Sequence, residues 1–245
     1  MPLNVARDGR VAILTLDDPE RRNAMTAPLV AEIVAAMDAI DADPTIGAVV
    51  VTGAGSAFCS GADVKALAAM AAGTEEPADV RDIYAGFLRV LDSPLPTIAA
   101  VNGPAVGAGC NLALACDLRM AGPSAIFDAR FLRIGIHPGG GHSWLLHRAV
   151  GPQTAAALNL FGARIDGVRA AEIGLAWECV PDDELLGRSV ALAARAAEVA
   201  RDLSVRTKAT LRHTADLTDH DAAMRYELEH QVWSLRSGFP AASGR

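Results

Sequence analysis

Residues 97–112 read TIAAVNGPAVGAGCNL. An apolar run rich in strand-forming residues ends at Asn102-Gly103-Pro104, and the glycine-rich turn Gly107-Ala108-Gly109 then leads into a run that fits a helix. The first N–H groups of a helix have no acceptor within the helix, and the helix dipole adds positive potential there. The stretch therefore predicts a site where backbone N–H groups stabilise an oxygen atom that acquires negative charge.

The rest of the chain alternates expected strands and helices up to about His142. A hairpin is expected over Leu3–Leu16 through Asp8-Gly9, and the β-branched run Ala48–Gly53 is typical of a buried parallel strand. We therefore expect an α/β fold with a largely parallel sheet and right-handed crossovers. Beyond His142 the predicted helices are Leu145–Val150, Thr154–Phe161, Val168–Ile173, Leu185–Val199, Val205–Leu217 and Ala222–Leu235.

Composition excludes several classes of protein. The net charge of -7, from 22 basic and 29 acidic residues, argues against nucleic acid or an anionic membrane as a partner. No apolar run approaches the ~18 residues that span a bilayer, and no targeting segment precedes the first strand, so we expect a cytoplasmic protein. The 4 cysteines lack C-x-x-C spacing, and we expect them to be buried apolar residues.

Two further motifs accompany residues 97–112. Pro19–Met25 reads PERRNAM, and Ser56–Lys65 reads SAFCSGADVK directly after a predicted buried strand. With the later loop Gly135–Gly141, these segments closely resemble the crotonase (enoyl-CoA hydratase/isomerase) superfamily. The resemblance is dense from Val11 to Val199 and implies a crotonase-like ββα spiral core. Residues 1–190 would form this acyl-CoA-binding core, and residues 191–245 a C-terminal helical region shorter than is usual for the family.

The resemblance also implies which residues bind the ligand. The N–H groups of Ala62 and Ala108 would form an oxyanion hole for a coenzyme A thioester. The residues expected along the coenzyme and the thioester are Arg22, Ala24, Gly61, Ala62, Asp63, Val64, Lys65, Gly107 and Ala108. No cofactor other than the thioester itself, as substrate or ligand, is expected.

Both acid/base positions of the family's hydratases differ here. In the ungapped alignment Asn111 and Phe131 stand where the hydratases carry glutamates, and neither side chain exchanges a proton near neutral pH. We therefore expect two-glutamate hydration to be absent or very slow. Asp128 and His137 are candidate substitutes. Alternatively, Asp128 pairs with a neighbouring arginine and His137 bonds to backbone.

Two other kinds of site fit poorly. The Gly107-Ala108-Gly109 turn would need a further glycine at Leu112 to match a dinucleotide fingerprint. His137 and His142 flank three glycines without a third nearby ligand, so no metal site is expected.

Three functions remain open from the sequence. The chain is expected to be an enzyme on acyl-CoA thioesters, a non-catalytic acyl-CoA-binding protein, or a structural subunit. The resemblance implies a homotrimer or a dimer of trimers. Physical support for assembly comes from the helix expected after Val180, whose apolar positions would need a partner surface: Leu185, Leu186, Val190, Leu192 and Val199.

Overall fold

The computed structural model describes residues 2–63, 67–68, 72–73 and 78–238 of the 245. Within them the main sheet has six strands, in the order β1 (Leu3–Asp8), β2 (Val11–Leu16), β3 (Ala48–Gly53), β4 (Thr97–Val101), β6 (Leu118–Ala121) and β9 (Glu178–Cys179). β1 pairs antiparallel with β2, and every later pairing in this sheet is parallel. The predicted α/β class, hairpin and parallel sheet are confirmed.

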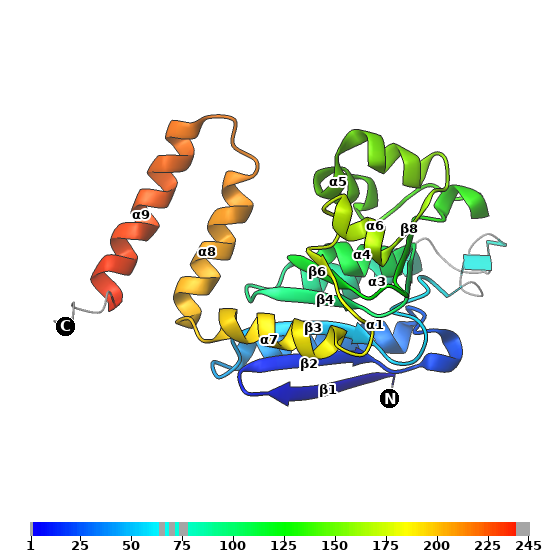
Figure 1. Ribbon diagram of the computed structural model, residues 1–245, viewed down its shortest axis with the longest axis horizontal. Coiled ribbons are helices and arrows are strands. Elements are labelled where there is room, and N and C mark those ends of the chain that lie inside the picture. The colour runs from blue at the N-terminus through cyan, green and yellow to red at the C-terminus, as the bar shows by residue number, and fades with distance from the viewer. Residues whose placement is uncertain (1, 64–66, 69–71, 74–77, 239–245) are drawn as a thin grey trace.

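Helices cover both faces of this sheet (Figure 1). On one face lie α1 (Ala27–Ala42), α3 (Ala78–Leu91) and α4 (Ala108–Ala115); on the other lies α7 (Leu185–Ala197). In β3, Val49 and Val51 pack toward the first group, whereas Val50 packs toward α7. Because both faces are covered, β3 is apolar at successive positions rather than alternating.

A second, three-stranded sheet lies beside the first. It contains β5 (Pro104–Val106), β7 (Ile126–Asp128) and β8 (Arg164–Asp166), with the helices α5 (His142–Asn159) and α6 (Gly167–Glu172) nearby. Two short 3-10 helices, η1 (Pro19–Arg21) and η2 (Phe131–Ile134), precede α1 and α5. The two helices predicted around residues 145–161 form one element, α5, with a kink at Gly151, whose φ is 74° and ψ 175°.

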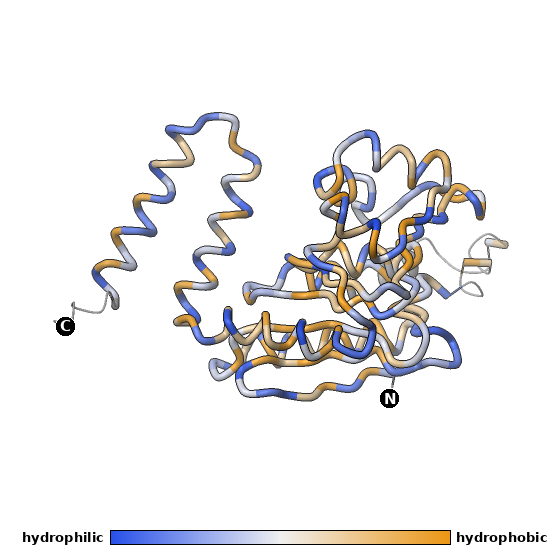
Figure 2. The backbone as a smooth tube through the Cα atoms, in the orientation of Figure 1, coloured by the Kyte–Doolittle hydropathy of each residue, from blue (hydrophilic) through white to orange (hydrophobic). Residues whose placement is uncertain are grey.

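The last two helices form a hairpin that extends from the main body. α8 (Arg201–Thr214) follows α7, and α9 (His220–Gly238) packs along the outer side of α8 (Figure 1). Figure 2 shows hydrophilic and hydrophobic residues interspersed along both helices. The buried Lys208 ammonium ties α8 to the body by donating to the Leu95 carbonyl, 2.6 Å away, beside the Asp117 carboxylate.

The apolar positions that the sequence offers for assembly on and after α7 differ in exposure. Leu185 is buried, and Val190 and Leu192 pack against the chain's own sheet, whereas Leu186 and Val199 are exposed. Ala193 and Ala197 are buried there as well, and the boundary expected at residue 190 falls inside α7. Further large exposed apolar side chains lie on α8 and α9: Leu203, Leu211, Met224, Leu228 and Leu235. None of the helices in the described part of the chain is long and apolar enough to cross a membrane.

Candidate active site

Three of the sequence motifs meet at one end of the second sheet. Met25 forms a parallel bridge with Ala62, and Cys59 forms one with Ala105. The Ser60 N–H donates to the Arg22 carbonyl at 2.9 Å, so the segment around Arg22 lies along the segment around Gly61. The motifs that resemble the family in sequence are therefore neighbours in space.

The two expected donors lie on adjoining loops. Ala108 is the first residue of α4, so its N–H has no acceptor within the helix, and the Ala62 N–H donates no hydrogen bond to the described part of the chain. Gly107 precedes α4 with φ 52° and ψ -113°, and Gly61 has φ 93°, both in regions that favour glycine. A Cβ built on Gly61 would overlap the Val106 carbonyl oxygen and lie 3.4 Å from the Ala108 nitrogen. Only glycine allows these loops to approach so closely.

A cavity of about 450 Å³ opens beside the two donors. We call it the donor cavity. Its described lining is Ser60, Gly61, Ala62, Leu67, Ile83, Tyr84, Val106, Gly107, Ala108, Asn111, Ala129, Arg130, Phe131, Ile134, Ile136, His137 and Gly139. Most of these side chains are apolar or absent, as in pockets that take small organic ligands.

The expected coenzyme residues flank this cavity. Arg22 is exposed, Ala24 is buried at 9% exposure, and Asp63 is half-buried next to Ala62. Val64 and Lys65 lie outside the described residues.

Asn111 is held by two hydrogen bonds. Its Nδ2 donates to the Gly139 carbonyl at 3.0 Å, and its Oδ1 lies 2.6 Å from His142 Nδ1. A carbonyl oxygen only accepts, so the Gly139 contact fixes which end of the amide is nitrogen. His142 Nδ1 therefore carries the proton and donates to Asn111, and one Nδ2 hydrogen of Asn111 remains for a ligand.

His142 is a neutral group behind the cavity wall. Burial lowers its pKa from 6.5 to about 4, and the nearby Asn159 carboxamide opposes the shift only in part. The Phe131 ring meets the imidazole edge-on, with centroids 4.9 Å apart. Asn111 and Phe131, the residues expected at the two glutamate positions, thus pack around one uncharged histidine.

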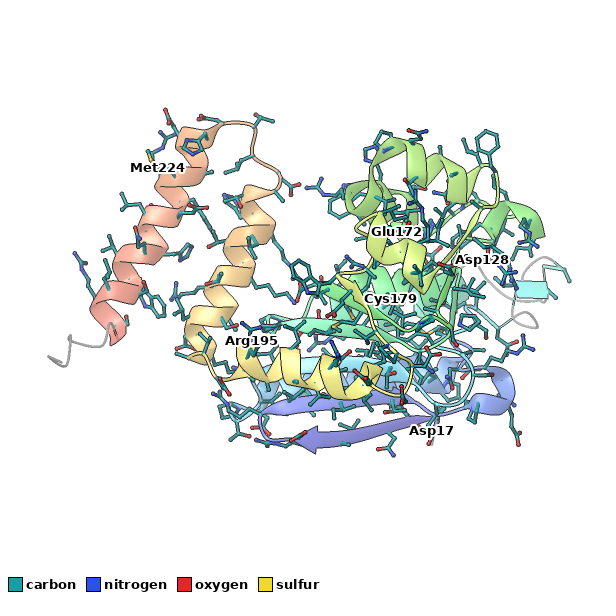
Figure 3. All side chains as sticks on the ribbon, in the orientation of Figure 1. Asp17, Asp128, Glu172, Cys179, Arg195 and Met224 are labelled. Atoms are coloured by element: carbon teal, nitrogen blue, oxygen red, sulfur yellow. The ribbon has the colours of Figure 1, made fainter. Side chains whose placement is uncertain are left out.

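The two candidate substitutes occupy different surroundings. Asp128 is buried, and its Oδ2 lies 2.9 Å from Arg130 Nη2, 3.8 Å from Arg133 Nη1 and 3.6 Å from Arg164 Nε. Asp128 is not among the residues that line the donor cavity. Its side chain lies at the end of the molecule away from α8 and α9 (Figure 3). The alternative, a strand-end acid paired with arginines, describes this geometry.

His137 does line the donor cavity. Its exposed ring holds Nδ1 2.7 Å from the Pro138 carbonyl, which only accepts, so Nδ1 carries the proton and Nε2 is left to face solvent or a ligand. Geometry therefore leaves His137, and not Asp128, within reach of a molecule in the cavity.

Sequence reasoning missed two residues of this site. The sequence offers His142 only as a poor metal ligand, because its partner Asn111 is 31 residues away and no local pattern joins them. Tyr84 lines the cavity from α3, and a Cβ on Gly139 would overlap its hydroxyl oxygen. The pairing of Gly139 with a tyrosine hydroxyl has no signal in either segment alone.

The buried cysteines are not nucleophiles here. Burial raises the pKa of Cys59, Cys110 and Cys116 to about 12, so these thiols stay protonated. Cys179 is half-buried, with its pKa also raised. The prediction that the cysteines serve as apolar core residues is confirmed for the first three.

A second, larger groove lies elsewhere. It has a volume of about 860 Å³ and runs between α8 and the body of the molecule, with Trp144, Leu203 and Leu211 in its lining. It shares no described lining residue with the donor cavity.

Comparison with known proteins identifies the family. A model of the enoyl-CoA hydratase/isomerase family matches residues 6–234. The chain belongs to the enoyl-CoA hydratase/isomerase family. It is 49% identical over 243 residues to a probable enoyl-CoA hydratase, EchA14, of Mycobacterium tuberculosis, a match that covers 96% of this chain and 93% of the relative.

Solved structures of family members have the same fold. An enoyl-CoA hydratase from Polaromonas sp. JS666 superposes with a TM-score of 0.89 at 30% identity, covering 96% of this chain and 92% of that one. A monofunctional enoyl-CoA isomerase from M. smegmatis superposes with a TM-score of 0.77 at 32% identity. The match covers 91% of this chain and 98% of that one. The expected crotonase fold is confirmed.

Proposed function

We propose that this enoyl-CoA hydratase/isomerase family member binds an acyl-CoA thioester in the donor cavity and stabilises the thioester oxygen with the Ala62 and Ala108 N–H groups. The observation that carries the proposal is that both N–H groups lie on touching loops beside the cavity and find no acceptor among the described residues. Preorganised donors of this kind stabilise an oxygen that gains charge during reaction.

Two-carboxylate hydration is not part of the proposed function. Hydration needs one group to activate water and another to supply a proton to carbon. The positions that would hold those groups carry a fixed carboxamide and a phenyl ring, and no carboxylate is present among the described residues that line the cavity. Where proton transfer occurs, His137 is the group we propose for it, because its imidazole lines the cavity.

Arg22, Ala24, Gly61, Asp63 and Gly107 support the same proposal. They surround the donor segments, and we propose that coenzyme A runs along them from the exposed Arg22 to the thioester. Val64 and Lys65 stay predictions for the same role. A non-catalytic acyl-CoA-binding protein is the second candidate, favoured by Phe131, whose apolar ring suits an acyl chain better than an activated water.

Calorimetry with matched ligands tests the proposed function. Butyryl-CoA should bind with micromolar affinity, and S-butyl-CoA, a thioether without the carbonyl oxygen, should bind about tenfold more weakly or worse, because it offers no acceptor to the two donors. Equal affinity for thioester and thioether, or no saturable binding of either, would contradict the proposal.

A further inference from the structure

We propose that Arg130 selects short acyl groups that end in a carboxylate, so that the preferred ligand is a dicarboxylic acyl-CoA rather than a simple fatty acyl-CoA. This inference rests on the proposed function and names its substrate class. Arg130 lines the donor cavity, and no carboxylate is present among the described residues that line it. An arginine in a wall of mostly apolar side chains gains no electrostatic energy from an alkyl chain, whereas an anion gives it a charge-assisted hydrogen bond.

The Asp128 carboxylate binds the Nε and Nη2 edge of the Arg130 guanidinium. These two nitrogens donate to Asp128 Oδ2 at 3.2 and 2.9 Å. Arginine carries five N–H donors, and Nη1 makes no hydrogen bond with the described part of the chain. The side chain is 42% exposed, so an incoming anion can reach the donors that remain.

One carboxylate does not neutralise this cluster. Arg133 and Arg164 approach the same Asp128 oxygen at 3.8 and 3.6 Å, so three guanidinium groups share a single negative charge. Their positive potential extends to Arg130, the member of the cluster that faces the donor cavity. Asp128 thereby orients Arg130 and leaves its charge in excess.

The fold sets the length of the acyl group. β5 and β7 are parallel, Val106 pairs with Asp128, and the Gly107 N–H donates to the Asp128 carbonyl at 2.9 Å. Ala108 and Arg130 each follow these paired residues by two positions. The anion site therefore begins next to the oxyanion donor in the strand register, which favours a short dicarboxylic acyl group.

Succinyl-CoA and butyryl-CoA provide the test, because both carry four-carbon acyl groups that differ in a terminal carboxylate or methyl. Calorimetry on the full chain should show succinyl-CoA binding about 10- to 100-fold more tightly. Arg130→Gln should remove this preference and bring the ratio of the succinyl-CoA and butyryl-CoA affinities to about one. Arg130→Lys keeps the positive charge and should therefore retain part of the preference for succinyl-CoA.

Arg133→Gln is the matched control. It removes a guanidinium from the same Asp128 cluster, but Arg133 does not line the donor cavity, so the preference should persist. Equal wild-type affinity for the two ligands would overturn the inference. So would an Arg130→Gln variant that weakens free CoA and both acyl-CoAs alike, because the arginine would then serve the coenzyme phosphates. If neither acyl-CoA binds, the proposed function itself fails.

Discussion

The Asn111 carboxamide oxygen accepts a hydrogen bond from His142 Nδ1 over 2.6 Å. Asn111 is the residue that the sequence resemblance predicts at the position of a hydratase glutamate. With its oxygen engaged by histidine and one amide hydrogen by the Gly139 carbonyl, Asn111 can offer a ligand a donor but cannot take up a proton. The arrangement suits holding an acyl group in place and does not suit activating water.

The first prediction concerns hydration. Wild-type protein should hydrate crotonyl-CoA more slowly than a two-glutamate hydratase by several orders of magnitude, because each acid/base group supplies about 10²–10⁴-fold and losses within one unit are not additive. Loss of the enoyl-thioester absorbance measures the rate, with a two-glutamate member of the family assayed in parallel. A rate equal to that of the reference enzyme would show that other groups fill both roles.

The second prediction concerns stability against pH. Burial lowers the pKa of folded His142 from 6.5 to about 4, so the unfolded chain binds a proton there more readily than the folded one. Its contribution to the free energy of unfolding is present above pH 6.5 and declines as pH falls toward 4, by up to about 3 kcal/mol in total. Urea unfolding at several pH values measures it.

His142→Gln is the comparison for that measurement, since the amide can still donate to Asn111 but does not titrate. The wild-type curve should fall more steeply than the variant's between about pH 7 and pH 5. Parallel curves would mean that His142 has an ordinary pKa in the folded protein.

The third prediction concerns the glycine that lets the donor loops meet. Gly61→Ala should lower the affinity for butyryl-CoA at least about tenfold, because the new Cβ would overlap the Val106 carbonyl and push the Ala62 and Ala108 loops apart. Gly174→Ala is the control, because Gly174 also has positive φ, at 75°, but has no atom within 4 Å of an added Cβ. Calorimetry on both variants separates the overlap from backbone strain. Equal losses would attribute the effect to strain alone.

The fourth prediction concerns assembly. Large apolar side chains are exposed on α8 and α9, including Leu211 at 67% and Leu228 at 55%. A helix hairpin with such a surface favours association. Light scattering should give a trimer or a dimer of trimers of the 25.4 kDa chain, and a monomer at micromolar concentration would contradict it.

The sequence predicts what depends on local pattern. Continuous apolar strands such as Ala48–Gly53, the Asp8-Gly9 hairpin and the helix start at Ala108 follow from residue type and spacing, and the structure has each of them. The strands β5 and β8 escaped prediction because each has only three residues and gains its order from pairing with β7.

The candidate site likewise has features that local sequence predicts and features that depend on the packing of distant segments. The glycine turns that carry Ala62 and Ala108 are visible in sequence because backbone geometry demands glycine there. The contact of Asn111 with His142, and the sharing of Asp128 among three arginines, arise only when distant segments pack. The sequence alone therefore could not separate Asp128 from His137 as an acid/base candidate.

The vibrational frequency of a bound thioester carbonyl tests the central claim most directly. Isotope-edited infrared spectra of butyryl-CoA labelled with ¹³C at the carbonyl should show the C=O stretch at lower frequency when bound than when free in water, because two aligned N–H donors polarise the bond. A saturating ligand whose carbonyl frequency is unchanged or higher than in water would contradict binding of the thioester oxygen by Ala62 and Ala108.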